Sequence, residues 1–157
     1  MTRSLVTTLG ILAILAPSVR GQGVPSPQQY FGFEMGSDRQ LANWDELTGY
    51  YEELAQRSDR VIVDTLGATT TGRPFVMATI TSPENHARLA ELQEIQMKLA
   101  DPRIISNEAE LKQLFNDGKA VAMITHGIHS TEVGPSQMGA RLAYTMASSN
   151  EERILEI

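Results

Sequence analysis

The hydrophobic and polar positions along the 157-residue chain follow helical spacing in some segments and strand-like spacing in others. In residues 41–58, apolar side chains recur at steps of three and four residues, which predicts an amphipathic helix. Residues 60–69 and 74–82 are rich in β-branched residues and are predicted to form two strands. Gly72 and Pro74 favour a turn between them, so a hairpin is the simplest connection. The helical positions are Leu41, Trp44, Leu47, Tyr51 and Leu54.

Two more helices are predicted in the middle of the chain. Residues 82–102 carry an apolar stripe at helical spacing, with Ser82 as the N-cap and Pro83 at the first helical position. Residues 106–118 are predicted to form a shorter helix. His86 lies among polar neighbours, so we expect it to be a solvated surface residue. The stripe consists of Leu89, Leu92, Ile95 and Leu99.

The last third of the chain completes the predicted architecture. Residues 119–127 are apolar almost throughout, which predicts a third strand buried in the middle of a sheet. Residues 135–149 then predict a helix. This order indicates an α/β fold, a mixed β-sheet flanked by helices. Residues 151–157 read as polar helical sequence without a closing strand, so we expect the fold to be C-terminally incomplete. The core side chains of the last long helix are expected to be Met138, Leu142 and Met146.

The N-terminus has the pattern of an export signal. Arg3 supplies a positive start, residues 4–16 are apolar but too short for a spanning helix, and Gly21 offers a cleavage site. We therefore expect residues 1–21 to be a signal peptide, no membrane span after cleavage, and a secreted or periplasmic protein. An uncleaved membrane anchor is the alternative. Residues 22–40 are expected to be a lead-in that packs on the body through Tyr30, Phe31 and Phe33.

Composition and charge narrow the chemistry that the chain can perform. The apolar content of 41% and the charged content of 20% favour one packed globular domain over a disordered chain. A formal net charge of -6 argues against nucleic acid as a partner, since such a partner requires a basic face. The chain contains no cysteine, so any transition-metal site must use His, Asp and Glu.

Candidate chemistry is concentrated in "THGIHSTEVG", residues 125–134. His129 and Glu132 lie just after the predicted third strand, where open α/β sheets bind ligands. An imidazole nitrogen and a carboxylate oxygen are both good Zn²⁺ ligands, and glycines beside them allow a tight loop. The H-x-x-E spacing alone is weak evidence. Two alternatives remain open at this point: loop residues that only form hydrogen bonds, and a ligand pair of His126 with His129.

Two segments resemble a known family. "GIHSTEVG" resembles the first zinc-binding segment of the zinc carboxypeptidases, and "LGATTTGRPFVMATITSPEN" is similar to the hairpin that precedes it. The resemblance implies that residues 41–157 are the N-terminal part of a catalytic domain with a carboxypeptidase-like fold. It also implies Zn²⁺ as the cofactor, with His129 and Glu132 as metal ligands. The substrate it implies is a peptide or protein C-terminus, whose terminal peptide bond is hydrolysed.

The resemblance leaves other parts of such a site unassigned. The family's third zinc ligand, its general-base Glu and its carboxylate-binding residues are all downstream, so we expect them beyond Ile157 and expect this chain to be inactive alone. Ser130 and Thr131 fill the spacer positions, and we expect them to cap the following helix. Two alternatives to a carboxypeptidase are a zinc amidohydrolase or deacylase of the same fold, and a non-catalytic binding module.

Overall fold

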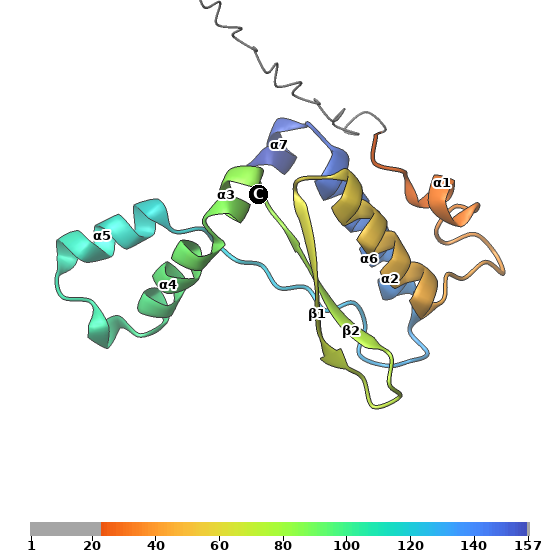
Figure 1. Ribbon diagram of the computed structural model, residues 1–157, viewed down its shortest axis with the longest axis horizontal. Coiled ribbons are helices and arrows are strands. Elements are labelled where there is room, and N and C mark those ends of the chain that lie inside the picture. Colours follow the sequence, from red (N-terminus) through yellow and green to blue (C-terminus); the bar gives the residue numbers. More distant parts are fainter. Residues whose placement is uncertain (1–22, 157) are drawn as a thin grey trace, which may run out of the picture.

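The computed structural model describes residues 23–156, so the signal peptide predicted for residues 1–21 lies outside the described residues. The body contains two long helices side by side, α2 (Trp44–Arg57) and α6 (Val133–Ser148). An antiparallel hairpin of β1 (Val61–Ala68) and β2 (Pro74–Ile80) lies against them (Figure 1). The predicted helices and the predicted hairpin in these parts of the chain are therefore confirmed.

The remaining elements are short, apart from the two helices of a projecting arm. Helices α4 (Leu89–Ala100) and α5 (Glu108–Asp117) form this arm, which extends away from the body (Figure 1). The arm has a small core of its own, in which Leu92 and Ile95 meet Leu114. None of the described helices is long and apolar enough to cross a membrane. Besides α2, α6 and the hairpin, the helical elements are α1 (Pro27–Phe31), α3 (Pro83–Ala87), α4 (Leu89–Ala100), η1 (Pro102–Ile104), α5 (Glu108–Asp117) and α7 (Glu152–Leu155).

The helix predicted over residues 82–102 is interrupted. Ser82 caps its start as expected, because its side chain accepts the backbone N–H of Asn85. Arg88 then leaves the helical region, with φ -123° and ψ 23°, and this break separates α3 from α4. The expected solvation of His86 is wrong: both of its ring nitrogens are buried, and neither has a hydrogen-bond partner among the described residues.

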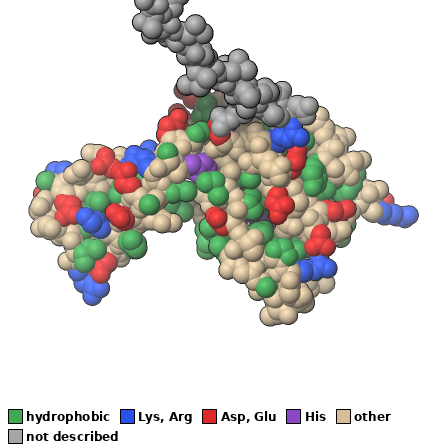
Figure 2. Space-filling view, in the orientation of Figure 1, with side chains coloured by type: hydrophobic (Ala, Val, Ile, Leu, Met, Phe, Trp, Pro, Cys, Tyr) green, Lys and Arg blue, Asp and Glu red, His purple; other side chains and the backbone are tan. Residues whose placement is uncertain are grey.

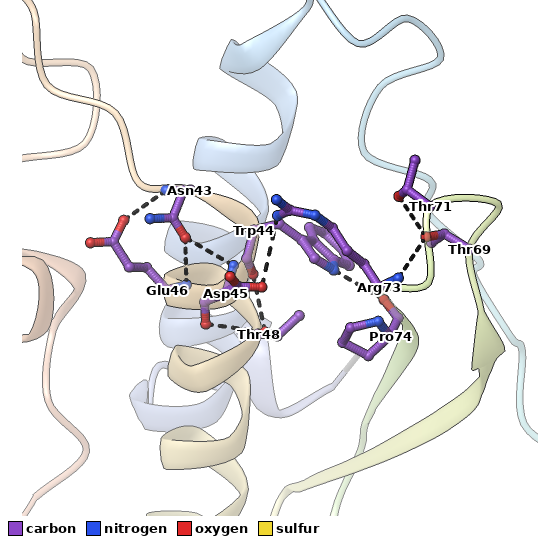
Figure 3. Close-up of polar contacts among 9 residues, drawn as sticks. All are labelled: Asn43, Trp44, Asp45, Glu46, Thr48, Thr69, Thr71, Arg73 and Pro74. Carbon is purple, nitrogen blue, oxygen red and sulfur yellow. Dashed lines mark hydrogen bonds and ion pairs between the residues drawn. The ribbon is translucent and has the colours of Figure 1, made fainter.

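The tip of the hairpin is fastened to the start of α2. The indole Nε1 of Trp44 donates to the Pro74 carbonyl at 3.0 Å, and Arg73 lies 3.7 Å from the Asp45 carboxylate (Figure 3). Gly72 has φ +78°, a conformation that glycine adopts without steric cost, so the predicted turn chemistry is confirmed. Asn43 caps α2, because its side-chain oxygen accepts the backbone N–H groups of Asp45 and Glu46.

The third strand predicted over residues 119–127 does not form. In the described residues the sheet contains β1 and β2, and this segment is not paired with either of them. Its apolar side chains are therefore exposed, Val121 to 78% and Met123 to 85%. Its apolar pattern indicates a need for burial, but a strand also needs a neighbouring strand for its backbone hydrogen bonds. The described chain thus combines helices with a small antiparallel sheet, rather than the larger mixed sheet flanked by helices that we predicted.

The main core lies between α2, α6 and β1. Tyr50 and Leu54 are fully buried there, although the helical stripe predicted in this region did not include Tyr50. The core face of α6 differs from the predicted one, because Met138 is 65% exposed and Leu142 is 36% exposed. Alanines occupy the buried face instead, and their small side chains allow α2 and α6 to approach closely. These buried alanines are Ala140, Ala143 and Ala147.

The aromatic residues of the lead-in pack on the body as expected. The rings of Tyr30 and Phe31 lie 5.0 Å and 5.1 Å from the ring of Tyr50. The Tyr50 hydroxyl donates to the Pro25 carbonyl at 2.8 Å. Because this hydroxyl has a partner, the largest buried ring of the core carries no unsatisfied polar group. Other hydrophobic side chains remain at the surface of both the body and the arm (Figure 2).

A buried amide connects the segment just before α2 to α6, and its removal is our first prediction. Gln137 is 7% exposed and bonds both backbone groups of Ala42, accepting its N–H at 3.1 Å and donating to its carbonyl at 3.0 Å. Gln137→Ala leaves both groups buried without a partner, so we expect a loss of about 2–4 kcal/mol in the free energy of unfolding. Urea denaturation measures this loss. Ser136→Ala, at the half-buried neighbouring residue whose hydroxyl donates only to the Val133 carbonyl of its own helix, is the control, and an equal loss in the two variants would contradict the prediction.

Candidate metal centre

The loop that carries the candidate ligands closes onto the start of α6. Glu132 occupies the N-cap position of this helix, and its backbone N–H donates to the His129 carbonyl at 3.0 Å. Gly127 has φ +91°, and a Cβ atom there would lie 3.6 Å from the Glu132 carbonyl oxygen and 3.7 Å from Pro135 Cβ. A left-handed residue without a side chain therefore lets the chain turn tightly at this point.

The structure brings His129 and Glu132 together. The Nδ1 atom of His129 lies 2.9 Å from Oε1 of Glu132, and the two side chains are 70% and 49% exposed. The other carboxylate oxygen, Oε2, accepts the backbone N–H of His129 at 3.2 Å and that of Ile128 at 3.4 Å. One carboxylate oxygen thus fixes the loop backbone, while the other faces an imidazole nitrogen.

The same contacts control the charge of the carboxylate. The hydrogen bond from His129 is the largest of the effects that hold the pKa of Glu132 below its usual value. The backbone N–H groups of His129 and Ile128 add to this effect, because they stabilise the charged form. The carboxylate is therefore ionised at neutral pH, which is the form that binds a metal.

The pair fits a zinc ion in donor chemistry, and in part in geometry. Two donors of four-coordinate zinc at bond lengths of about 2.0–2.2 Å lie roughly 3.3–3.6 Å apart. Since Nδ1 of His129 and Oε1 of Glu132 are separated by 2.9 Å, their hydrogen bond would have to open slightly to admit the ion. Across residues 23–156, no group of three or more His, Asp or Glu side chains could hold a metal. The described residues therefore supply a pair of donors and no third one beside it.

The neighbouring candidates take other positions. The ring of His126 lies against α6, where Cβ of a side chain at Gly139 would come within 3.0 Å of its Cγ and Cδ2 atoms. Neither Ser130 nor Thr131 caps α6, because Glu132 itself occupies the N-cap position and no side chain caps this helix. The capping role that we expected for the two spacer residues is therefore wrong.

His129 and Glu132 do not line the cavity between the two helices of the arm. A cavity of about 230 Å³ lies between α4 and α5, and its walls include Glu94, Ile95 and Leu114 but neither candidate ligand. His129 and Glu132 instead lie on an open loop. The walls of a substrate cleft are therefore not evident around the pair in the described part of the chain.

Tyr51, on the α2 side of the same region, leads to a prediction about alkaline pH. Burial raises the pKa of Tyr51 to about 12, whereas an unfolded tyrosine titrates near its usual value of about 10. A pKa raised by folding contributes stability below about pH 10, and this contribution is lost as the pH rises through about 12. We expect the urea midpoint of the protein to fall over this interval and to fall less in Tyr51→Phe. Equal alkaline losses in the two proteins would contradict the prediction.

Comparison with known proteins identifies the family. No match was found among curated proteins or among solved structures. A family model described as zinc carboxypeptidase matches residues 47–157, which is well over half of the chain. The matched region contains both the hairpin and the loop with His129 and Glu132 on which the resemblance depended. The resemblance is therefore confirmed, and the chain belongs to the zinc carboxypeptidase family of metallopeptidases.

Proposed function

We propose that this chain forms the metal-holding part of a zinc-dependent carboxypeptidase that hydrolyses C-terminal peptide bonds. In this proposal His129 and Glu132 are two of the zinc ligands. The observation that carries it is the 2.9 Å approach of His129 Nδ1 to Glu132 Oε1 within the region that matches the family. The third ligand, the general base and the group that binds the substrate's terminal carboxylate are not assigned to residues of this chain.

Each side chain has a distinct part in this proposal. His129 offers a neutral imidazole nitrogen to the metal, and Glu132 offers an anionic oxygen that reduces the net positive charge of the site. Because Oε2 of Glu132 accepts two backbone N–H groups, Oε1 is the carboxylate oxygen that is left to face the metal. Zinc, when bound, polarises the scissile carbonyl of the substrate and activates water as the nucleophile.

The route of the protein out of the cytoplasm is also part of the proposal. The positive start and the apolar stretch within residues 1–21 support export by a cleaved signal peptide. We propose a secreted or periplasmic enzyme on this basis. N-terminal sequencing of the protein recovered from the exporting cell tests this, since a mature chain that begins after Gly21 is expected.

A zinc titration tests the proposed ligands. We expect the full chain to bind Zn²⁺ weakly in calorimetry, because two side chains hold the ion less firmly than three. His129→Ala removes one donor and is expected to weaken binding at least about tenfold. Ser130→Ala is the matched control, since it alters the same loop without removing a proposed donor. If His129→Ala and the wild-type chain bound zinc equally well, the proposed site would be wrong.

A further inference from the structure

We propose that Gly139 is a positioning residue for the His129–Glu132 pair. In this view, the missing side chain at Gly139 lets the ring of His126 pack directly on α6, and this contact fixes the loop that carries both donors. The inference rests on the proposed function, because it concerns what orients the same site. Gly139 lies in the middle of α6 and does not itself contact the two donors.

The space beside Gly139 is already occupied by two side chains from elsewhere in the chain. A Cβ atom at this position would lie 2.8 Å from the Tyr51 hydroxyl oxygen and 3.0 Å from two ring carbons of His126. These separations are shorter than the roughly 3.5–4.0 Å of favourable non-bonded contact. A residue with a side chain at this position would therefore displace the His126 ring, the Tyr51 side chain, or both.

The chain also passes close to α6 one helical turn away on the same face of the helix. Pro135 and Gly139 are four residues apart in the helix, so they lie one above the other. A Cβ atom at Gly127 would lie 3.7 Å from Pro135 Cβ, in ordinary contact. The consecutive residues His126 and Gly127 thus lie along one face of α6, at Gly139 and at Pro135.

The loop is therefore fixed to α6 at both of its ends. The His126 ring holds the start of the loop against α6, Gly127 passes close to Pro135, and Glu132 ends the loop as the N-cap residue of the helix. His129 lies between the two ends of the loop. Its separation from Glu132 therefore depends on the position of the first loop residues. Since the donors must move only a few tenths of an ångström to reach the separation that zinc requires, a small shift of the loop entry changes metal affinity.

Helix propensity alone favours alanine at position 139, so a loss of zinc binding in this variant is informative. Glycine inside a helix is less favourable than alanine, so Gly139→Ala would stabilise α6 if nothing lay beside it. Gly134 is in the same helix, and no atom lies within 4 Å of a Cβ placed there. Gly134→Ala is therefore a matched control, with the same substitution in the same helix but without the contact.

Zinc calorimetry on the full chain tests the inference. We expect Gly139→Ala to bind Zn²⁺ about tenfold more weakly than the wild type, which is the scale seen when a group that orients a ligand is lost. Gly134→Ala is expected to bind as the wild type does. His126→Ala removes the ring and is expected to weaken binding to a similar extent. The double variant Gly139→Ala/His126→Ala is expected to lose no more than either single variant, because both changes remove one contact.

Several outcomes would overturn the inference. Wild-type zinc affinity in Gly139→Ala would do so, and so would additive losses in the double variant. If circular dichroism shows that Gly139→Ala does not fold, His126→Ala decides alone: a tenfold loss supports the inference and wild-type affinity refutes it. His129→Ala is measured in the same series. Wild-type affinity in that variant would mean that the proposed zinc site has failed, whereas a loss seen there but not in Gly139→Ala would refute only the positioning role.

Discussion

Leu54→Ala is expected to lower the free energy of unfolding by about 3–4 kcal/mol, a large part of the stability of a domain this size. Leu54 is fully buried in the core between α2, α6 and β1. Its removal loses apolar burial and leaves a cavity that the small alanines of α6 cannot fill. Urea denaturation followed by circular dichroism gives the change in unfolding free energy.

Leu41→Ala is the matched control for this prediction. Leu41 is 53% exposed and precedes α2, so the same substitution there is expected to change stability by no more than about 0.5 kcal/mol. A cost at Leu54 as small as the cost at Leu41 would show that the described core is not formed in solution. The comparison also tests the packing that places α6, and with it Glu132, beside α2.

The elements that the sequence predicted well are those with local signals. The β1–β2 hairpin has β-branched strands on both sides of a turn with Gly72, and helix α3 has Ser82 and Pro83 at its start. These signals act between residues close in the chain, so they do not depend on the rest of the fold. The approach of His129 to Glu132 was predictable for the same reason, since only two residues of a tight loop separate them.

The elements that the sequence did not predict depend on contacts between distant segments. Residues 119–127 have the apolar pattern of a strand, but pattern alone does not supply the neighbouring strand that pairing requires. The apolar side chains buried on α6 are alanines rather than Met138 and Leu142, because closeness to α2 favours small side chains there. The contact of His126 with Gly139 joins a loop to a helix interior, and no spacing rule indicated it.

Glu132→Gln and Glu132→Asp separate three roles of the carboxylate, and this is the change with the largest expected effect on activity. If Glu132 is a zinc ligand, Gln retains its size and a carbonyl oxygen but loses the charge, so zinc binding and peptide hydrolysis should be lost together. Asp retains the charge but is shorter by one methylene, so added zinc should restore hydrolysis further in Glu132→Asp than in Glu132→Gln. We expect this result, because Oε1 of Glu132 is the oxygen that faces His129 Nδ1.

The two other roles give different patterns in the same measurements. A general base would leave zinc bound in Glu132→Gln while hydrolysis stopped, because the proton acceptor alone would be lost. A carboxylate that only fixes the loop through the backbone N–H groups of His129 and Ile128 would let Gln, whose carbonyl oxygen still accepts them, retain both zinc and activity. Zinc binding is measured by calorimetry on this chain. Peptide hydrolysis is measured on an enzyme that contains this chain. Full zinc occupancy in an inactive Gln variant would show that Glu132 acts on the proton rather than on the metal.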